Sequence, residues 1–124
     1  MIKQFLFVGL GGALGSMLRY GTSLLTAKYY ANTFPLATFL TNVLGCLLIG
    51  SFIGYFSKSG NQNLQFLLIT GFCGGYTTFS TFAAENLALY QSEHYLTLVA
   101  YTLASVFIGL SAVALGMHFF IAKP

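Results

Sequence analysis

Long stretches without a charged side chain limit what this chain can fold into. Residues 29–57, 59–84 and 94–122 contain no Asp, Glu, Lys or Arg. Residues 4–18 form a shorter stretch, which extends beyond Arg19 where that side chain faces protein or water. A helix that crosses a bilayer needs about 20 mostly apolar residues. The sequence therefore predicts an all-α membrane protein surrounded by lipid, a single domain over residues 1–124, with four transmembrane helices at about residues 3–27, 36–57, 64–91 and 96–121.

The composition excludes several classes of function. The chain has five Lys or Arg and two Asp or Glu among 124 residues, whereas roughly 25% of the residues in a soluble domain are charged. Four crossings leave no room for a soluble catalytic domain. The cations are scattered and form no basic patch, so no nucleic acid partner is expected. His94 and His118 have no nucleophile at a matching spacing, and the protein is predicted not to be an enzyme.

The distribution of cations gives little preference for one orientation in the membrane. Lys and Arg near the ends of a span favour the cytoplasmic side. With four spans, Lys3, Lys58 and Lys123 share one face, and Lys28 lies with Arg19 on the other. This near balance predicts that the chain inserts in both orientations and forms an antiparallel, dual-topology homodimer. The alternative, a weak bias that the insertion machinery completes into one orientation, stays open.

The second predicted helix carries one narrow polar face. Thr38, Asn42 and Gly45 fall at positions i, i+4 and i+7 of this helix, which places them on the same side. A buried amide in a membrane helix either bonds to another helix or lines a polar path. For Asn42 alone, both interpretations stay open.

The third predicted helix contains a segment that does not suit a plain span, GFCGGYTTFSTF at residues 71–82. Gly74 and Gly75 are predicted to break this helix near the middle of the membrane and to free backbone carbonyls. Irregular backbone at that depth is tolerated where it lines a cavity or binds an ion. The alternative is that the two glycines only permit a close helix crossing.

Aromatic and hydroxyl side chains follow these glycines. Phe79 and Phe82 share a helical face with Asn86, and four hydroxyls lie around them, at Thr77, Thr78, Ser80 and Thr81. Hydroxyls and the positively polarised edges of aromatic rings can bind an anion, whereas freed carbonyls can hold a hard cation. Phenylalanines at helical spacing usually pack in a core or face lipid, but this placement favours a pore.

Three segments in this order, GGALGSMLRY at 11–20, TFLTNVLGCLLIG at 38–50 and GFCGGYTTFSTF at 71–82, resemble the Fluc (CrcB) family of fluoride channels over essentially the whole chain. The resemblance implies an antiparallel dual-topology homodimer with two pores and a structural sodium ion on the dimer axis. It also implies passive, fluoride-selective conduction that relieves fluoride toxicity across a bacterial cell (inner) membrane.

The resemblance assigns roles to individual residues. Phe79 and Phe82 match the paired phenylalanines of the fluoride pathway, and the backbone carbonyls of Gly74 and Thr77 match the sodium ligands. The remaining matches are polar: Asn42 on the second helix, Ser80 and Thr81 on the third, Tyr101 on the fourth, and Arg19 and Glu85 near the vestibule. Thr38 shares the helical face of Asn42 and is predicted to line the same pore. One departure lies on the fourth helix, where Gly109 stands at the place of a serine, with Ser105 and Ser111 nearby.

Two alternatives from other classes remain at this point. A small dual-topology multidrug or cation exporter needs a membrane-embedded glutamate on its first helix, where this chain has Arg19 and no carboxylate. A non-transporting membrane assembly subunit would need only the glycine-rich helix faces, but that function leaves the sequence TTFSTF unexplained.

Overall fold

The structure, a computed structural model, describes residues 1–121, and every regular element within them is helical. This confirms the all-α prediction. Three long helices are continuous: α1 (Ile2–Tyr29), α2 (Leu36–Phe56) and α6 (Tyr95–Ile121). Lys123, which entered the cation balance, lies outside the described residues.

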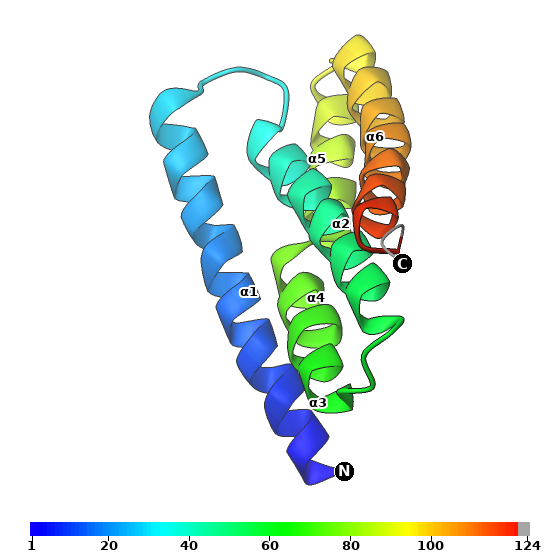
Figure 1. The fold of residues 1–124 in the computed structure, drawn as a ribbon. Helices are drawn as coiled ribbons and strands as arrows, with labels where there is room; N and C mark the ends of the chain where they lie inside the picture. Colours follow the sequence, from blue (N-terminus) through cyan, green and yellow to red (C-terminus); the bar gives the residue numbers. More distant parts are fainter. Residues whose placement is uncertain (122–124) are drawn as a thin grey trace.

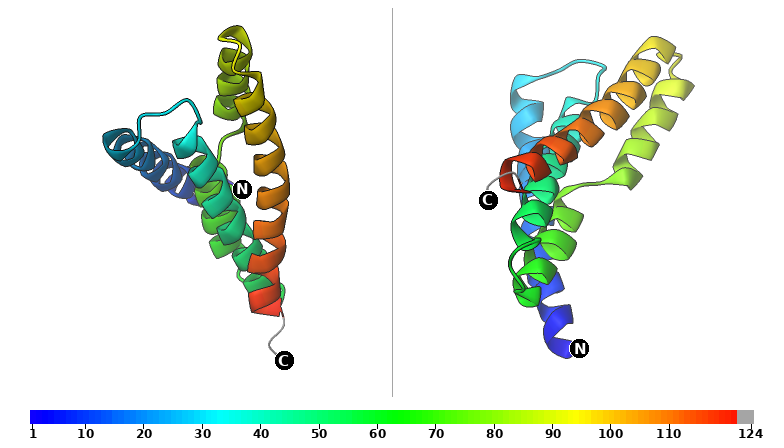
Figure 2. Two further views of the ribbon diagram at one scale, coloured as in Figure 1. Left: turned by 90° about the horizontal axis from the view of Figure 1, so that it is seen from above. Right: turned by 45° about the vertical axis from the view of Figure 1, so that its right-hand side comes forward.

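The remaining helical segment lies between α2 and α6 in the sequence and consists of several pieces. They are α3 (Gln62–Gln65), the π-helix η1 (Phe66–Cys73), α4 (Gly74–Tyr76) and α5 (Phe79–Gln91). In Figure 1, α4 lies between α1 and α2, and α5 forms a hairpin with α6. Figure 2 shows that this hairpin diverges from α1 toward the end that carries the α5–α6 turn.

Glycines bring the helices into backbone contact at two seams. On the seam between α1 and the η1–α4 segment, a β-carbon on Gly15 would lie 2.7 Å from the backbone nitrogen of Tyr76. On the seam between α2 and α6, a β-carbon on Gly116 would lie 2.7 Å from the backbone nitrogen of Ser51. Small residues allow helices to pack this closely in a membrane, where the hydrophobic effect does not drive helices together. The seams fix the frame from which α5 extends.

The predicted position of the helix break is wrong. Gly74 has helical dihedral angles (φ −62°, ψ −36°), and α4 continues through Gly75 to Tyr76. The backbone is extended instead at Thr77 (φ −80°, ψ 157°) and Thr78 (φ −152°, ψ 116°). β-branched residues favour extended backbone, while Gly75 serves the seam, since a β-carbon there would lie 3.0 Å from Cα of Gly12.

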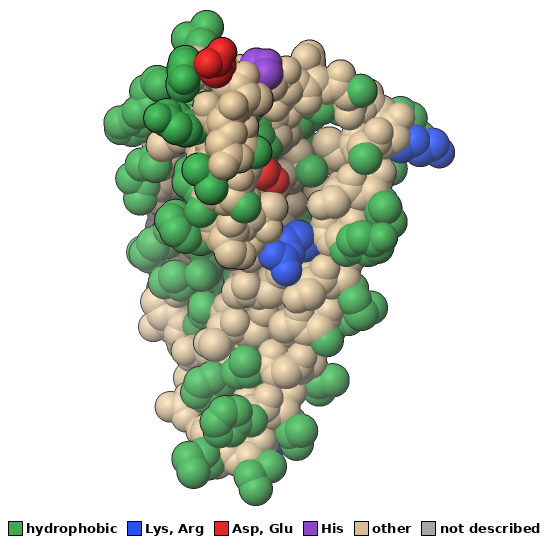
Figure 3. Space-filling view, turned by 180° about the vertical axis from the view of Figure 1, so that it is seen from behind, with side chains coloured by type: hydrophobic (Ala, Val, Ile, Leu, Met, Phe, Trp, Pro, Cys, Tyr) green, Lys and Arg blue, Asp and Glu red, His purple; other side chains and the backbone are tan. Residues whose placement is uncertain are grey.

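The surface of the described chain is largely apolar, as a membrane protein requires. Large hydrophobic side chains are exposed along most helices, and Figure 3 shows them covering both flanks of one face around a central hollow that holds a Lys or Arg side chain. Of the described helices, α2 and α6 are long and apolar enough to cross a membrane by length and composition.

Candidate functional site

The break between α4 and α5 is held by the side chain of Asn42. The backbone N–H of Thr78 donates to Asn42 Oδ1 at 2.8 Å, and Asn42 Nδ2 donates to the backbone oxygen of Thr78 at 3.1 Å. One side-chain amide thus pairs with both polar backbone groups of Thr78, which a continuous helix would have paired internally. A second N–H of the Asn42 amide remains available, because only one is used in this pair.

Hydroxyl groups cluster where α5 begins. Thr78 caps the helix, because its Oγ1 accepts a hydrogen bond from the backbone N–H of Thr81 at 3.2 Å. The Thr78 hydroxyl also lies 3.1 Å from the Thr81 hydroxyl and 3.2 Å from the Ser80 hydroxyl. The positive end of the α5 dipole therefore faces the same region as these donors.

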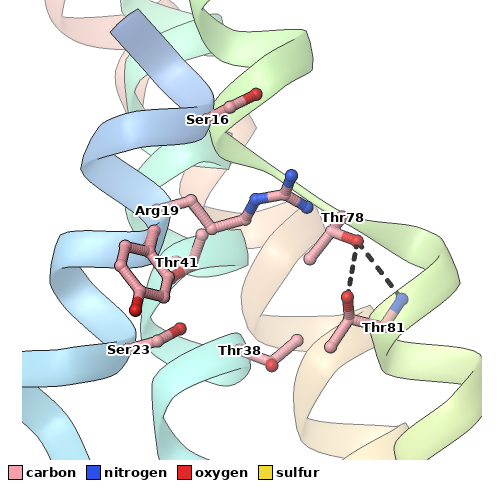
Figure 4. Close-up of a pocket in the computed structure, with 8 residues that line it drawn as sticks. Ser16, Arg19, Ser23, Thr38, Thr41, Thr78 and Thr81 are labelled. Atoms are coloured by element: carbon pink, nitrogen blue, oxygen red, sulfur yellow. Dashed lines mark hydrogen bonds between the residues drawn. The ribbon is translucent and has the colours of Figure 1, made fainter. Parts of the chain in front are cut away.

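A cavity of about 260 Å³ opens beside this helix start. Figure 4 shows Arg19 reaching from α1 toward Thr78, with Thr81 beside Thr78 and Thr38 below them in the view. Within the described part of the chain, Arg19 makes no ion pair. We name this the arginine cavity, and its lining consists of Ser16, Arg19, Tyr20, Ser23, Thr38, Thr41, Thr78 and Thr81.

Thr41 is the unusual member of the arginine cavity. Its side chain is only 1% exposed, and its hydroxyl has no hydrogen-bond partner among the described residues. A threonine in a helix commonly bonds to the carbonyl four residues earlier, and Thr41 does not. A buried donor without a partner is costly, and this one belongs to a side chain that lines the arginine cavity.

A second cavity, of about 340 Å³, lies on the other side of the break. We name it the phenylalanine cavity, and it is lined by Asn42, Gly45, Cys46, Ile49, Thr77, Thr78, Phe79, Phe82, Ser105 and Val106. The ring centroid of Phe82 lies 5.7 Å from that of Phe79 and 5.0 Å from that of Tyr101. Thr78 lines both cavities, so the helix break is the wall they share.

Glu85 ties α5 to its two neighbours. Its Oε1 accepts from the Thr38 hydroxyl at 2.5 Å, and its Oε2 accepts from the Tyr101 hydroxyl at 2.9 Å. Tyr101 is fully buried. A single carboxylate therefore joins α2, α5 and α6, with each of its oxygens bound to a hydroxyl donor.

The structure brings most of the predicted site residues together around the break, but not all. Ser80 is exposed, touches the Thr78 hydroxyl and lines neither named cavity. Gly74 lies on an exposed part of α4, where an added β-carbon would meet nothing within 4 Å. No group of three or more His, Cys, Asp or Glu that could hold a metal occurs among residues 1–121.

Two residues of the cavities were not predicted as site residues from the sequence, Thr41 and Ser105, the second of which lies near Gly109 on the fourth predicted helix. The Ser105 hydroxyl is buried, also has no partner in the described part of the chain, and lines the phenylalanine cavity. The signals were present, because Thr41 follows Thr38 by three residues and Ser105 follows Tyr101 by four, which are same-face spacings in a helix.

Both cavities lie within a segment that matches a known family. The family model described as "CrcB-like protein, Camphor Resistance (CrcB)" matches residues 6–117. The chain belongs to this family.

Curated relatives cover nearly the same length. A Flavobacterium psychrophilum protein is 52% identical over 118 residues, which are 94% of this chain and 95% of the relative. An Azobacteroides pseudotrichonymphae protein is 46% identical over 118 residues, 94% of each chain. An Ignicoccus hospitalis protein is 47% identical over 116 residues, 93% of each chain. All three are named "Fluoride-specific ion channel FluC", and none of the three names describes an exporter or an assembly subunit.

Proposed function

We propose that this chain is a fluoride-selective ion channel, which lets fluoride leave a bacterial cell passively through the inner membrane. The observation that carries the proposal is the pair of cavities that share the Thr78 wall, lined by hydroxyl, amide and aromatic donors. Relatives named as fluoride-specific channels, 46–52% identical over 94% of the chain, support it.

The donors suit a small, strongly hydrated anion. Fluoride must exchange its water for several donors at once, because an unsatisfied buried charge costs many kcal/mol. The Thr41 hydroxyl and the second Asn42 N–H are available for this exchange, and Arg19 attracts the anion into the arginine cavity. Ring edges of Phe79 and Phe82 continue the path. Several weak sites in sequence allow the ion to leave as well as to enter.

The direction of transport follows from the membrane potential. An inside-negative potential favours anion efflux by about 2.3 kcal/mol per 100 mV. No pump is therefore needed. In this function all four helical segments cross the bilayer as one domain over residues 1–124, with the Thr77–Thr78 break at mid-membrane. Irregular backbone is tolerated at that depth because it lines the two cavities.

The site is completed by a second, antiparallel copy of the chain. Phe79 is 79% exposed although it belongs to the phenylalanine cavity, so part of this cavity's wall is missing from the single chain. The near balance of Lys3, Lys58 and Lys123 against Arg19 and Lys28 in the sequence supports insertion in both orientations. Termini tagged for protease accessibility are expected on both sides of the membrane in comparable amounts. A single orientation would remove the antiparallel dimer.

A structural sodium ion at the dimer axis fits the backbone at the break. In a continuous helix the N–H groups of Thr78 and Thr81 would bond to the carbonyls of Gly74 and Thr77. Here they donate instead to Asn42 Oδ1 and Thr78 Oγ1. Those two carbonyls lose their usual donors, and Gly74 lies open to a partner. Two carbonyls from each chain would hold the ion and stabilise the dimer.

The direct test is ion efflux from proteoliposomes that contain only the purified protein. The expected result is fluoride efflux without ATP or a proton gradient, with far slower chloride efflux. Replacing sodium with a large organic cation should inhibit fluoride flux or loosen the dimer, whereas indifference to that exchange would remove the sodium site. A strict requirement for a proton gradient would indicate coupled transport in place of a channel.

A further inference from the structure

The half-helix α5 is attached to the rest of the chain mainly through hydrogen bonds. Leu89 is its one buried side chain. Two attachments belong to the site already described, the pairing of Thr78 with Asn42 and the pairing of Glu85 with Thr38 and Tyr101. A third attachment lies beside them and has no role in the proposed ion path.

This third attachment joins Asn86 of α5 to Thr102 of α6. The Thr102 hydroxyl donates to Asn86 Oδ1 at 3.2 Å, and Asn86 Nδ2 donates to the backbone oxygen of Phe82 at 3.1 Å. One amide thus connects α6 to the backbone that carries the Phe82 ring. Tyr101, next to Thr102, has its ring centroid 5.0 Å from that of Phe82.

We propose that Asn86 and Thr102 are a positioning pair that fixes the rotation of α5 against α6 and so holds Phe82 in the ion path. The proposal rests on the proposed fluoride channel. Residues 85 and 86 of α5 bond side by side to residues 101 and 102 of α6. A helix turns about 100° per residue, so two adjacent bonds define its rotation where one bond would act as a pivot.

The simpler alternative is that Asn86 and Thr102 only satisfy each other's polar groups in the membrane. The two possibilities differ in what a doubly apolar pair would do. If the two residues only pair with each other, replacing both by apolar ones leaves no polar group without a partner, and the flux of the double variant equals that of the original protein. If the pair positions Phe82, the double replacement leaves α5 free to rotate, and flux stays low.

The experiment measures fluoride flux per dimer in proteoliposomes for Asn86→Leu, Thr102→Val and the double variant. Dimer recovery is checked by size-exclusion chromatography. We expect flux to fall about fivefold in each variant, a ratio equivalent to about 1 kcal/mol. The double variant should stay within about twofold of the single ones. Thr102→Ser keeps the hydroxyl, so its flux should equal that of the original protein.

Thr97→Val is the matched control, because Thr97 is also half-buried on α6 and its hydroxyl makes no hydrogen bond within residues 1–121. Its flux should equal that of the original protein. If Asn86→Leu does not yield a dimer, the smaller Asn86→Ala takes its place in the single and the double variant. Recovery of flux in the double variant, or unchanged flux in every variant, would overturn the positioning role. Absence of fluoride flux in the unsubstituted protein would refute the channel itself.

Discussion

The segments on the two sides of the Thr77–Thr78 break are held in different ways. Before the break, η1 and α4 pack against α1 backbone to backbone, with Gly11 and Gly15 of α1 at the closest approach. After the break, α5 is held by hydrogen bonds from α2 and α6. Backbone contact gives a rigid frame that admits no side chain. Side-chain hydrogen bonds leave room for cavities and place donors along them.

The largest effect is expected from a side chain added to the rigid segment. Gly15→Ala would place a β-carbon 2.7 Å from the backbone nitrogen of Tyr76, and neither helix can yield. Overpacking typically costs about 1–3 kcal/mol and occasionally more, and here the β-carbon meets backbone atoms, so we expect little folded dimer by size-exclusion chromatography. Gly9→Ala is the control, because nothing lies within 4 Å of its added β-carbon. Normal recovery of the Gly15 variant would show that the seam is not rigid.

The next largest effect is expected at Asn42, whose side chain holds the break between α4 and α5. Asn42→Leu leaves both backbone groups of Thr78 without a partner, at a cost of about 1–3 kcal/mol for each group. We expect fluoride flux to fall about a hundredfold while the glycine seams still hold the frame together. Asn42→Asp keeps the acceptor for the Thr78 N–H, so its fluoride flux should lie between that of the original protein and that of Asn42→Leu. Full flux in Asn42→Leu would show that the Asn42 side chain is not needed to hold the break.

Substitutions of the two phenylalanines change α5 and leave the glycine seams unaltered. Phe79→Ile and Phe82→Ile remove ring edges and keep most of the apolar volume, so we expect about tenfold less flux from a dimer that still folds. Phe82→Ile should also lower stability slightly, because the Phe82 ring packs against Tyr101, whereas Phe79 is 79% exposed. Unchanged flux in both variants would make these rings packing residues.

The smallest effect is expected at Thr41. Its hydroxyl has no partner in the described chain, so Thr41→Val should leave thermal stability equal or slightly higher. Fluoride flux should nevertheless fall a few-fold, since one donor of the arginine cavity is gone. Thr41→Ser retains the hydroxyl and serves as the control. Loss of stability together with flux would mean that the hydroxyl serves folding and not the ion.

The helices could be predicted from the sequence, because stretches without charged residues are a local property of the chain. Charge-free stretches indicated membrane helices, and the resemblance of three segments, at residues 11–20, 38–50 and 71–82, indicated the family. The exact break and the π-helix over Phe66–Cys73 were not predicted, since both depend on how η1 and α4 fit against α1. The hydrogen-bond partners of Asn42 and Asn86 could not be predicted either, because the partner of Asn42 lies 36 residues away in the sequence and that of Asn86 lies 16 residues away.

We expect this chain to conduct fluoride and little chloride. The most direct measurement is the reversal potential of current across a planar bilayer that contains the purified protein, with a fluoride gradient opposed to a chloride gradient. We expect a reversal potential at the equilibrium potential of fluoride, unaffected by a proton gradient. A reversal potential at the chloride equilibrium potential, or the absence of any current together with proton-coupled uptake, would contradict it.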